Sequence, residues 1–233
     1  PGDLLLATLT EDEKELGVVL VEMGSGTTDI AVFLEGKIRH VATINLGGAN
    51  VSADIIHGLG VSPVDADRLK EEFGCAYEPM IQPGQFITLP STVTQGDRQI
   101  PYELLAHIIQ QRTDEIFDHV QRELERAGFA KQLNAGVVVT GGASVTAGIA
   151  ELASDLFGQT VRIGAPDGLD GLHEAVSSPR FSCVVGLAQF AAGRVAIAHM
   201  LQPAGSGKRS ATGTPAGMNQ IVGKVKEWFQ DFF

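Results

Sequence analysis

The chain has 233 residues, 44% of them hydrophobic and 19% charged, which is enough apolar material to bury a core in one or two domains. Its formal net charge is -11 and its 17 Lys and Arg residues form no dense stripe, which argues against nucleic acid as a partner. No apolar run approaches the roughly 20 residues of a membrane-spanning helix and the sequence does not open like a signal peptide, so we expect the bulk of the protein in the cytosol.

The first 50 residues predict a three-stranded meander. Residues 16–22 are mostly apolar and residues 30–34 are apolar, and Gly24-Ser25-Gly26-Thr27 between them predicts the turn of a buried β-hairpin. Residues 38–44 alternate between apolar and polar side chains, as expected of a half-exposed strand. Because the chain begins with Pro1 and soon enters a strand, we expect a fragment whose N-terminal part is missing.

Residues 51–135 predict an inserted subdomain made mostly of helices. Apolar side chains share one helical face in residues 51–59, and a second helix with Pro in its first turn is expected over residues 62–73. Short β-like pieces among Pro and Gly in residues 75–100 indicate a small sheet. The longest helical pattern runs over residues 101–128.

Residues 136–201 predict a return to the first domain. A continuous apolar strand at 136–140 leads through Gly141-Gly142 into an amphipathic helix at 144–157 and a strand at 160–163. This order predicts a β-α-β unit with parallel strands. The cysteines Cys75 and Cys183 fit neither a disulfide framework nor a metal-binding spacing, so we interpret both as core thiols.

The segment Glu22-Met23-Gly24-Ser25-Gly26-Thr27-Thr28-Asp29 offers the groups that a polyphosphate needs. Its glycines allow close approach, its N–H groups and hydroxyls can donate, and a carboxylate at each end could hold a metal ion through water. A Gly-rich hairpin turn without a ligand is the alternative. The second glycine turn, Gly141-Gly142-Ala143-Ser144 between a strand and a helix, favours the phosphate interpretation.

Together, the two motifs resemble the phosphate and adenosine motifs of the superfamily of actin, Hsp70 and the sugar kinases. Within it, the chain resembles the FtsA family of bacterial cell-division proteins from about residue 10 to residue 190, and again at the C-terminus. The resemblance is carried by Thr10-Glu11-Asp12-Glu13-Lys14-Glu15-Leu16-Gly17, the hairpin through Ala31, Arg39-His40, Gly74-Cys75-Ala76 and Val161-Arg162-Ile163-Gly164-Ala165-Pro166.

The resemblance implies an α/β fold, namely the second half of an actin-like (ribonuclease H-like) ATPase domain with a small inserted α+β subdomain and a C-terminal amphipathic helix. Residues 1–50 would hold the phosphate hairpin, 51–135 the inserted subdomain with its ribose-facing helix and long helix, and 136–201 the adenosine motif. ATP and Mg²⁺ are the implied ligands.

Roles for single residues follow from the same resemblance. The phosphates would be embraced by Gly24, Ser25, Gly26, Thr27 and Thr28, and the adenosine would lie against Gly141, Gly142 and Ala143. A side chain at the glycine pair would block the base, although an ordinary tight turn also explains it. Asp67 and Lys70, at i and i+3, match the acid and lysine that the family directs at ribose; a surface ion pair is the alternative.

Glu22 departs from the family's pattern, in which an Asp orients water around the metal. Because the glutamate is one methylene longer and hydrolysis depends on placement within a fraction of an ångström, we expect nucleotide binding with weak or absent ATPase activity. The first phosphate loop would belong to the missing half, so the fragment alone should be inactive. The scattered histidines give no expectation of a His-ligated metal, and no residue is predicted to be catalytic.

The C-terminal residues predict a tethered membrane helix. Residues 202–217 have the Gly, Ser, Ala, Thr and Pro composition of a flexible linker. Residues 218–233 place apolar side chains on one helical face, which suits insertion into the headgroup boundary, while docking on the protein's own core is the alternative. The expected membrane contacts are Ile221, Val225, Trp228, Phe229, Phe232 and Phe233.

As implied by the family, the partners are the C-terminal tail of FtsZ, further copies in an actin-like filament, other division proteins and the membrane surface. Arg112 on the long helix matches the FtsZ-binding feature and could pair with an acidic group, although an ordinary solvated Arg is equally compatible. We therefore expect a tether of the FtsZ ring to the cytoplasmic face of the inner membrane at the division site. A sugar-type kinase and a pilus or cell-shape adaptor of the same superfamily are the rivals.

Overall fold

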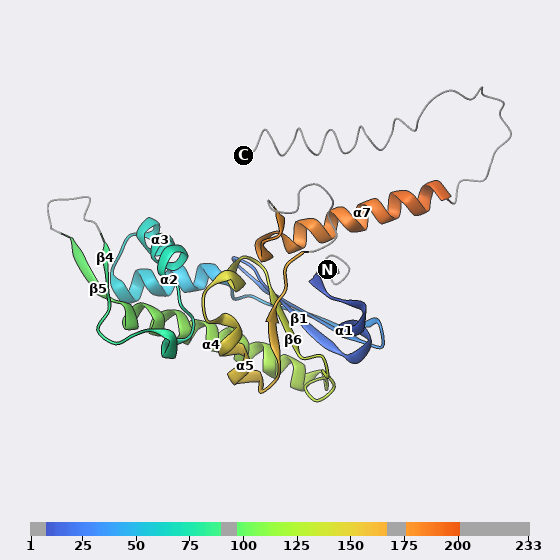
Figure 1. Ribbon diagram of the computed structural model, residues 1–233, viewed down its shortest axis with the longest axis horizontal. Helices are drawn as coiled ribbons and strands as arrows, with labels where there is room; N and C mark the ends of the chain where they lie inside the picture. Colours follow the sequence, from blue (N-terminus) through green and yellow to red (C-terminus); the bar gives the residue numbers. More distant parts are fainter. Residues whose placement is uncertain (1–7, 90–96, 167–175, 201–233) are drawn as a thin grey trace, which may run out of the picture. The chain divides into compact units, whose positions relative to one another are not determined.

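The computed structural model describes residues 8–89, 97–166 and 176–200, with side chains described up to residue 192 in the last segment (Figure 1). Its main sheet has five strands in the order β3-β2-β1-β6-β7. The pairs β1–β2 and β2–β3 are antiparallel, whereas β1–β6 and β6–β7 are parallel. The strands are β1 (Val18–Met23), β2 (Thr28–Leu34), β3 (Lys37–Ile44), β6 (Val137–Thr140) and β7 (Val161–Ile163).

The predicted meander and the parallel β-α-β pairing are both confirmed. Strands β1 and β6 are almost wholly buried because helices cover both faces of the sheet, while the edge strand β3 is half exposed. This burial explains why β1 and β6 read as continuous apolar runs and β3 alternates.

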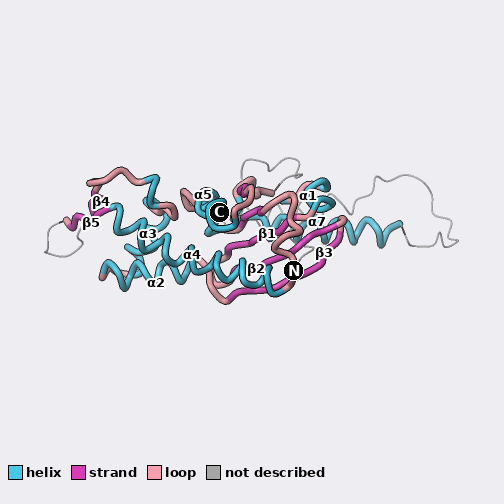
Figure 2. Tube along the Cα trace, turned by 90° about the horizontal axis from the view of Figure 1, so that it is seen from below, coloured by secondary structure: helices cyan, strands magenta, loops and turns pink. Residues whose placement is uncertain are grey.

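Four helices share a single hydrophobic core with the sheet: α2 (Gly48–Leu59), α3 (Pro63–Phe73), α4 (Tyr102–Arg126) and α5 (Ile149–Phe157). Helices α4 and α5 contact the sheet at β3 and β7, α2 packs on α4, and α3 packs on α2 (Figure 2). The long helix α4 buries one stripe, which includes Ile109, Ile116 and Phe117, and leaves its other side polar. The predicted long helix is therefore confirmed within two residues of its expected ends.

A second, two-stranded sheet is formed by β4 (Phe86–Leu89) and β5 (Arg98–Pro101), as predicted. It lies beside the N-terminal end of α4, away from the five-stranded sheet (Figure 1). Its inward side chains Ile87, Leu89 and Ile100 join the same core as the main sheet. The inserted region thus belongs to the same compact unit as the main sheet, and this unit extends to Arg194.

The helix predicted over residues 144–157 is wrong in its first turn. The chain instead forms a short 3₁₀ turn, Gly142–Val145, and α5 begins only at Ile149. Gly148 interrupts the helix with a φ of 79°, and the preceding Ala147 pairs with Cys75, its carbonyl accepting a 2.7 Å hydrogen bond from the Ala76 N–H. This long-range pairing overrides the local helical pattern.

Two helices cover the other face of the sheet. Helix α1 (Glu11–Leu16) and the start of α7 (Ser182–Met200) contact a cluster that includes Val18, Leu20 and Phe33. Neither helix was predicted, because α1 is short and α7 has no apolar stripe that recurs at helical spacing. Among the described residues, no helix combines the length and hydrophobicity required to cross a bilayer.

The predicted linker, residues 202–217, and the predicted membrane helix, residues 218–233, lie outside the described residues. Both predicted core thiols are free cysteines; Cys75 is buried and Cys183 is half-buried.

Helix α1 is held to the sheet by an ion pair that spans most of the chain. The Arg162 guanidinium on β7 donates 2.6 and 2.7 Å hydrogen bonds to the Glu13 carboxylate and a 2.8 Å bond to the Thr8 carbonyl. These bonds lower the pKa of Glu13. The same carboxylate accepts from the Thr10 N–H in a capping box at the start of α1.

We expect Glu13→Gln to lower the free energy of unfolding by about 1–2 kcal/mol at pH 7, because Gln keeps the cap but loses the charge that faces Arg162. A lowered carboxyl pKa stabilises the folded state above the unfolded value of about 4.3, and this contribution disappears as the pH falls through the folded value. Urea unfolding from pH 7 to pH 3 should therefore show the two proteins converging. Asp12→Asn, at an exposed position of α1, should stay within about 0.5 kcal/mol of wild type.

Candidate functional site

The turn between β1 and β2 presents unpaired backbone donors. The Gly24 N–H donates a 2.9 Å hydrogen bond to the Thr27 carbonyl and closes the turn. Within the described residues, the N–H groups of Ser25, Gly26 and Thr27 have no hydrogen-bond acceptor, and Ser25 and Gly26 are exposed. A row of free N–H groups at a glycine turn is a suitable cradle for an anion.

The two threonines of the turn have separate local partners. The Thr27 hydroxyl donates to the Asp29 carboxylate at 3.3 Å. Thr28 is fully buried, and its hydroxyl donates a 2.9 Å bond to the Leu46 carbonyl. This bond ties the Thr28 side chain to the segment that precedes α2. The expected role of Thr28 at phosphate stays a prediction.

The turn is fixed to the first turn of α2. The N–H groups of Gly48 and Ala49 donate 3.0 and 2.7 Å bonds to the carbonyls of Gly24 and Ser25. At the preceding Gly47, a Cβ would lie 2.6 Å from the Ser25 carbonyl oxygen, so no side chain fits there. Close contact between two backbones is what this glycine permits.

The two glycines of the second motif differ in their surroundings. Gly141 has a φ of 91°, and a Cβ on it would lie 2.5 Å from the Met23 carbonyl oxygen, so its glycine is required by the fold. A Cβ on Gly142 would meet nothing within 4 Å. Only Gly142 therefore keeps a space open, and the adenosine expectation applies to it more directly than to Gly141.

The two motifs meet in a cleft of about 390 Å³. This volume is in the range of small-molecule sites. The cleft is bounded by the hairpin turn, α2, α3, α4 and the 3₁₀ turn after β6. It is lined by Met23, Gly24, Ser25, Gly48, Val51, Lys70, Glu71, Gly74, Ile109, Thr113, Ile116, Gly142, Ala143, Val145, Thr146, Ile149 and Arg180.

Asp67 and Lys70 are brought together, but only Lys70 lines the cleft. The Lys70 ammonium donates to the Ser52 hydroxyl at 2.6 Å, to the Asp67 carboxylate at 3.2 Å and to the Gly48 carbonyl at 3.3 Å. The Ser52 hydroxyl lies 2.6 Å from the same Asp67 oxygen, and these contacts lower the pKa of Asp67. Asp67 thus orients Lys70, both directly and through Ser52. The expected contact of Asp67 with ribose stays a prediction.

Three side chains that sequence reasoning missed also line the cleft. Glu71 follows Lys70 directly and places a carboxylate at the cleft. Arg180 comes from the loop before α7, whose Pro179 carbonyl accepts a 3.2 Å bond from the Gly141 N–H. Thr113 lines the cleft from α4, together with Ile109 and Ile116. The helical period could have placed α4 there, but no local signal marked Arg180.

Two carboxylates lie behind the hairpin turn. Glu22 and Asp29 are direct cross-strand partners, and burial together with the Asp29 charge raises the pKa of Glu22. Among the residues described, no three His, Cys, Asp or Glu side chains converge on one point. A pair of carboxylates beside a phosphate site still suits Mg²⁺, which keeps several waters and takes few protein ligands.

The residues of the cleft fit a nucleoside triphosphate. The free N–H groups of the turn and the ammonium of Lys70 would hold phosphate, and the open space at Gly142 would admit a base. Glu22 and Asp29 would hold Mg²⁺ through water.

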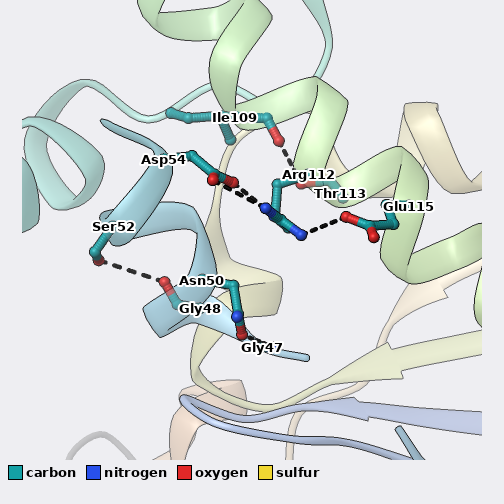
Figure 3. Close-up of polar contacts among 9 residues, drawn as sticks. All are labelled: Gly47, Gly48, Asn50, Ser52, Asp54, Ile109, Arg112, Thr113 and Glu115. Atoms are coloured by element: carbon teal, nitrogen blue, oxygen red, sulfur yellow. Dashed lines mark hydrogen bonds and ion pairs between the residues drawn. The ribbon is translucent and has the colours of Figure 1, made fainter. Parts of the chain in front are cut away.

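Arg112 lies outside the cleft and is engaged within the protein. Its guanidinium donates 2.5 and 2.9 Å bonds to the two oxygens of Asp54 on α2 and a further bond to Glu115 (Figure 3). The solvated arginine considered as an alternative is therefore wrong, because the side chain joins α2 to α4.

A family model described as "Cell division protein FtsA" matches residues 19–186 of this chain. The chain belongs to the FtsA family. Cell division protein FtsA of Pseudomonas aeruginosa is 37% identical over 227 residues, which cover 97% of this chain and 54% of the relative. The FtsA protein of Neisseria meningitidis is 38% identical over 229 residues, again 97% of this chain and 54% of the relative. The chain therefore spans about half the length of these FtsA relatives.

Solved structures confirm the actin-like fold. MreB5 of Spiroplasma citri bound to ADP superposes with a TM-score of 0.65 over 86% of this chain and 61% of its own, at 17% identity. A MamK double helical filament gives a TM-score of 0.56 over 75% of this chain and 54% of its own, at 16% identity. These likenesses show the fold alone, and they confirm the predicted actin-like fold class for the described residues.

The two glycines of the adenosine motif provide a matched test of this geometry. We expect Gly141→Ala to lower the free energy of unfolding by about 2–4 kcal/mol, because a Cβ would strain the left-handed backbone and overlap the Met23 carbonyl. Gly142→Ala, which adds the same methyl group into open space, should change it by less than about 0.5 kcal/mol. Denaturant unfolding measures both; equal losses would contradict the assignment of the two roles.

Proposed function

We propose that the protein to which this chain belongs is an ATP-binding, polymer-forming adaptor that tethers the FtsZ ring to the cytoplasmic face of the inner membrane. In this role it helps to assemble the septal machinery at the division site. The observation that carries the proposal is the meeting of the hairpin turn, Lys70 and Gly142 in one cleft of a chain that belongs to the FtsA family.

The proposed nucleotide site uses backbone more than side chains. The free N–H groups of Ser25, Gly26 and Thr27 would donate to phosphate, and the Lys70 ammonium would add positive charge at the cleft wall. The polyphosphate supplies the negative charge that these groups recognise. Apolar side chains of Val51, Ile109 and Ile149 would exclude water from the base side of the cleft.

We propose that nucleotide is held with little turnover. Glu22 stands where the family's motif has Asp, and its carboxyl group is already half-buried beside Asp29. Because Glu is one methylene longer than Asp, its carboxylate would lie away from the position at which an Asp would orient water. Nucleotide would then act chiefly by favouring one state of the polymer.

Membrane attachment is proposed for residues 218–233. Lys224 and Lys226 are balanced by Glu227 and Asp231, so apolar insertion rather than attraction to anionic lipid should dominate. One such helix anchors a protein only weakly and reversibly. Several helices on one polymer would add by avidity, which gives self-association a purpose.

Self-association and the partner proteins rest on the family and the fold. A structural neighbour forms a double helical filament, as the name of its structure states, which supports an actin-like polymer here. The acidic FtsZ tail is proposed to bind near Arg112. The sugar-type kinase and pilus or cell-shape adaptor alternatives are less well supported, since the family model that matches is that of FtsA.

Gly142→Glu in the full-length protein should weaken ATP binding at least about tenfold, or ~1.4 kcal/mol, because a long charged side chain would fill the space left for the base. Titration of a fluorescent ATP analogue in the presence of Mg²⁺ measures this. Gln111→Glu adds the same charge on the exposed side of α4 and should bind as wild type. Equal affinity of all three proteins would refute the placement of adenosine against Gly142.

Deletion of residues 218–233 should abolish co-sedimentation with vesicles of phosphatidylethanolamine and phosphatidylglycerol. Trp228→Ser, on the apolar face, should weaken it strongly, whereas Gln230→Ser, on the other face, should leave it unchanged. Because the charges are balanced, added salt should have little effect. Pelleting of the truncated chain to the same extent as the intact one would exclude this helix as the anchor.

A further inference from the structure

Arg180 is a cation at the cleft to which the described part of the protein gives no partner. The residue is exposed and lines the cleft, and within the described residues its guanidinium makes no hydrogen bond or ion pair, not even with Glu71 of the same lining. Lys70, the other cation that lines the cleft, donates to Ser52 at 2.6 Å and to Asp67 at 3.2 Å. The guanidinium of Arg180 is therefore the positive group that is available to a ligand.

The backbone of Arg180 is fixed beside the glycine pair of the second motif. The carbonyl of the preceding proline accepts a 3.2 Å bond from the Gly141 N–H, and the 3₁₀ turn that contains Arg180 contacts the 3₁₀ turn Gly142–Val145. Two residues further on, the buried Ser182 hydroxyl lies 2.6 Å from the Thr140 hydroxyl at the end of β6. These contacts hold Arg180 from both sides, so its side chain begins next to the wall of the cleft where the base is proposed to lie.

The cleft offers few flat groups to a purine. Purine rings bind to proteins by stacking on aromatic side chains or on the plane of an arginine. None of the described residues that line the cleft is aromatic, and most of them are glycines or aliphatic side chains. The guanidinium of Arg180 is planar and weakly hydrated, and a cation above a ring face is attracted to its π-electrons. Among the described lining, Arg180 is thus the side chain best suited to cover a base.

We propose that Arg180 covers the purine base of the bound nucleotide, with its guanidinium stacked on one face of the ring beside Gly142. This inference rests on the proposed nucleotide site, and it adds a residue that determines affinity for the base. The phosphates have other donors, namely the free N–H groups of the hairpin turn and the Lys70 ammonium. Because stacking involves the ring alone, Arg180 contributes equally to the binding of ATP and of ADP.

The experiment uses the full-length protein with Mg²⁺ and measures the affinities for ATP and ADP by isothermal titration calorimetry. Arg180→Ser should weaken both nucleotides by the same factor, about fivefold, because the stacked cation is lost. Arg180→Tyr loses the charge but provides a flat ring, so it should bind both within about twofold of wild type. Arg122→Ser removes the same charge from an exposed position of α4 outside the cleft and should bind as wild type.

The tyrosine variant separates a contact with the base from a contact with phosphate. If it binds as weakly as Arg180→Ser, the charge rather than the plane matters and the proposal is overturned. A loss that is larger for ATP than for ADP would place Arg180 at the terminal phosphate instead, and unchanged binding by Arg180→Ser would remove it from the site. If the wild-type protein binds neither nucleotide, the proposed nucleotide site itself is wrong. Arg180→Phe supplies the same ring should the tyrosine variant not fold.

Discussion

The contact between the hairpin turn and the N-terminus of α2 is the constraint on which the rest of the site depends. Two backbone hydrogen bonds, from the N–H groups of Gly48 and Ala49 to the carbonyls of Gly24 and Ser25, satisfy donors that a helix N-terminus would otherwise leave unpaired. The contact also turns the carbonyls of the hairpin toward the helix. The remaining N–H groups of the turn are thereby left free for a ligand.

Helix α2, which the hairpin turn holds in place, makes polar contacts with α3 and with α4. Ser52, almost fully buried, links Asp67 and Lys70 of α3, and the ammonium is held at the cleft wall as a result. Two residues later on α2, the Asp54 carboxylate accepts hydrogen bonds from the guanidinium of Arg112 on α4. Because both contacts involve charged groups with good geometry, removing one partner from either would leave the other with fewer hydrogen bonds to its charge.

How far the sequence predicts this arrangement depends on the range of each contact. The hairpin, the meander and the long helix follow from local periodicity and turn chemistry, which the nearest neighbours determine. The pairing of Arg112 with Asp54 crosses 58 positions, and that of Arg162 with Glu13 crosses 149, so no local pattern reports them. The role of Gly141 could not be predicted for the same reason. The glycine pair indicates a turn, but the Met23 carbonyl that excludes a side chain at Gly141 belongs to a strand far away in the sequence.

The cleft and the Arg112 face are two sides of one helix. Ile109, Thr113 and Ile116 recur at helical spacing and line the cleft, while Arg112 and Glu115 occupy the neighbouring turn positions. A ligand that displaced α4 would therefore also change the ion pair between Asp54 and Arg112. Under the proposed function, nucleotide and an acidic partner would therefore contact the same helix, α4. Any effect of one on the binding of the other would then have to be reciprocal.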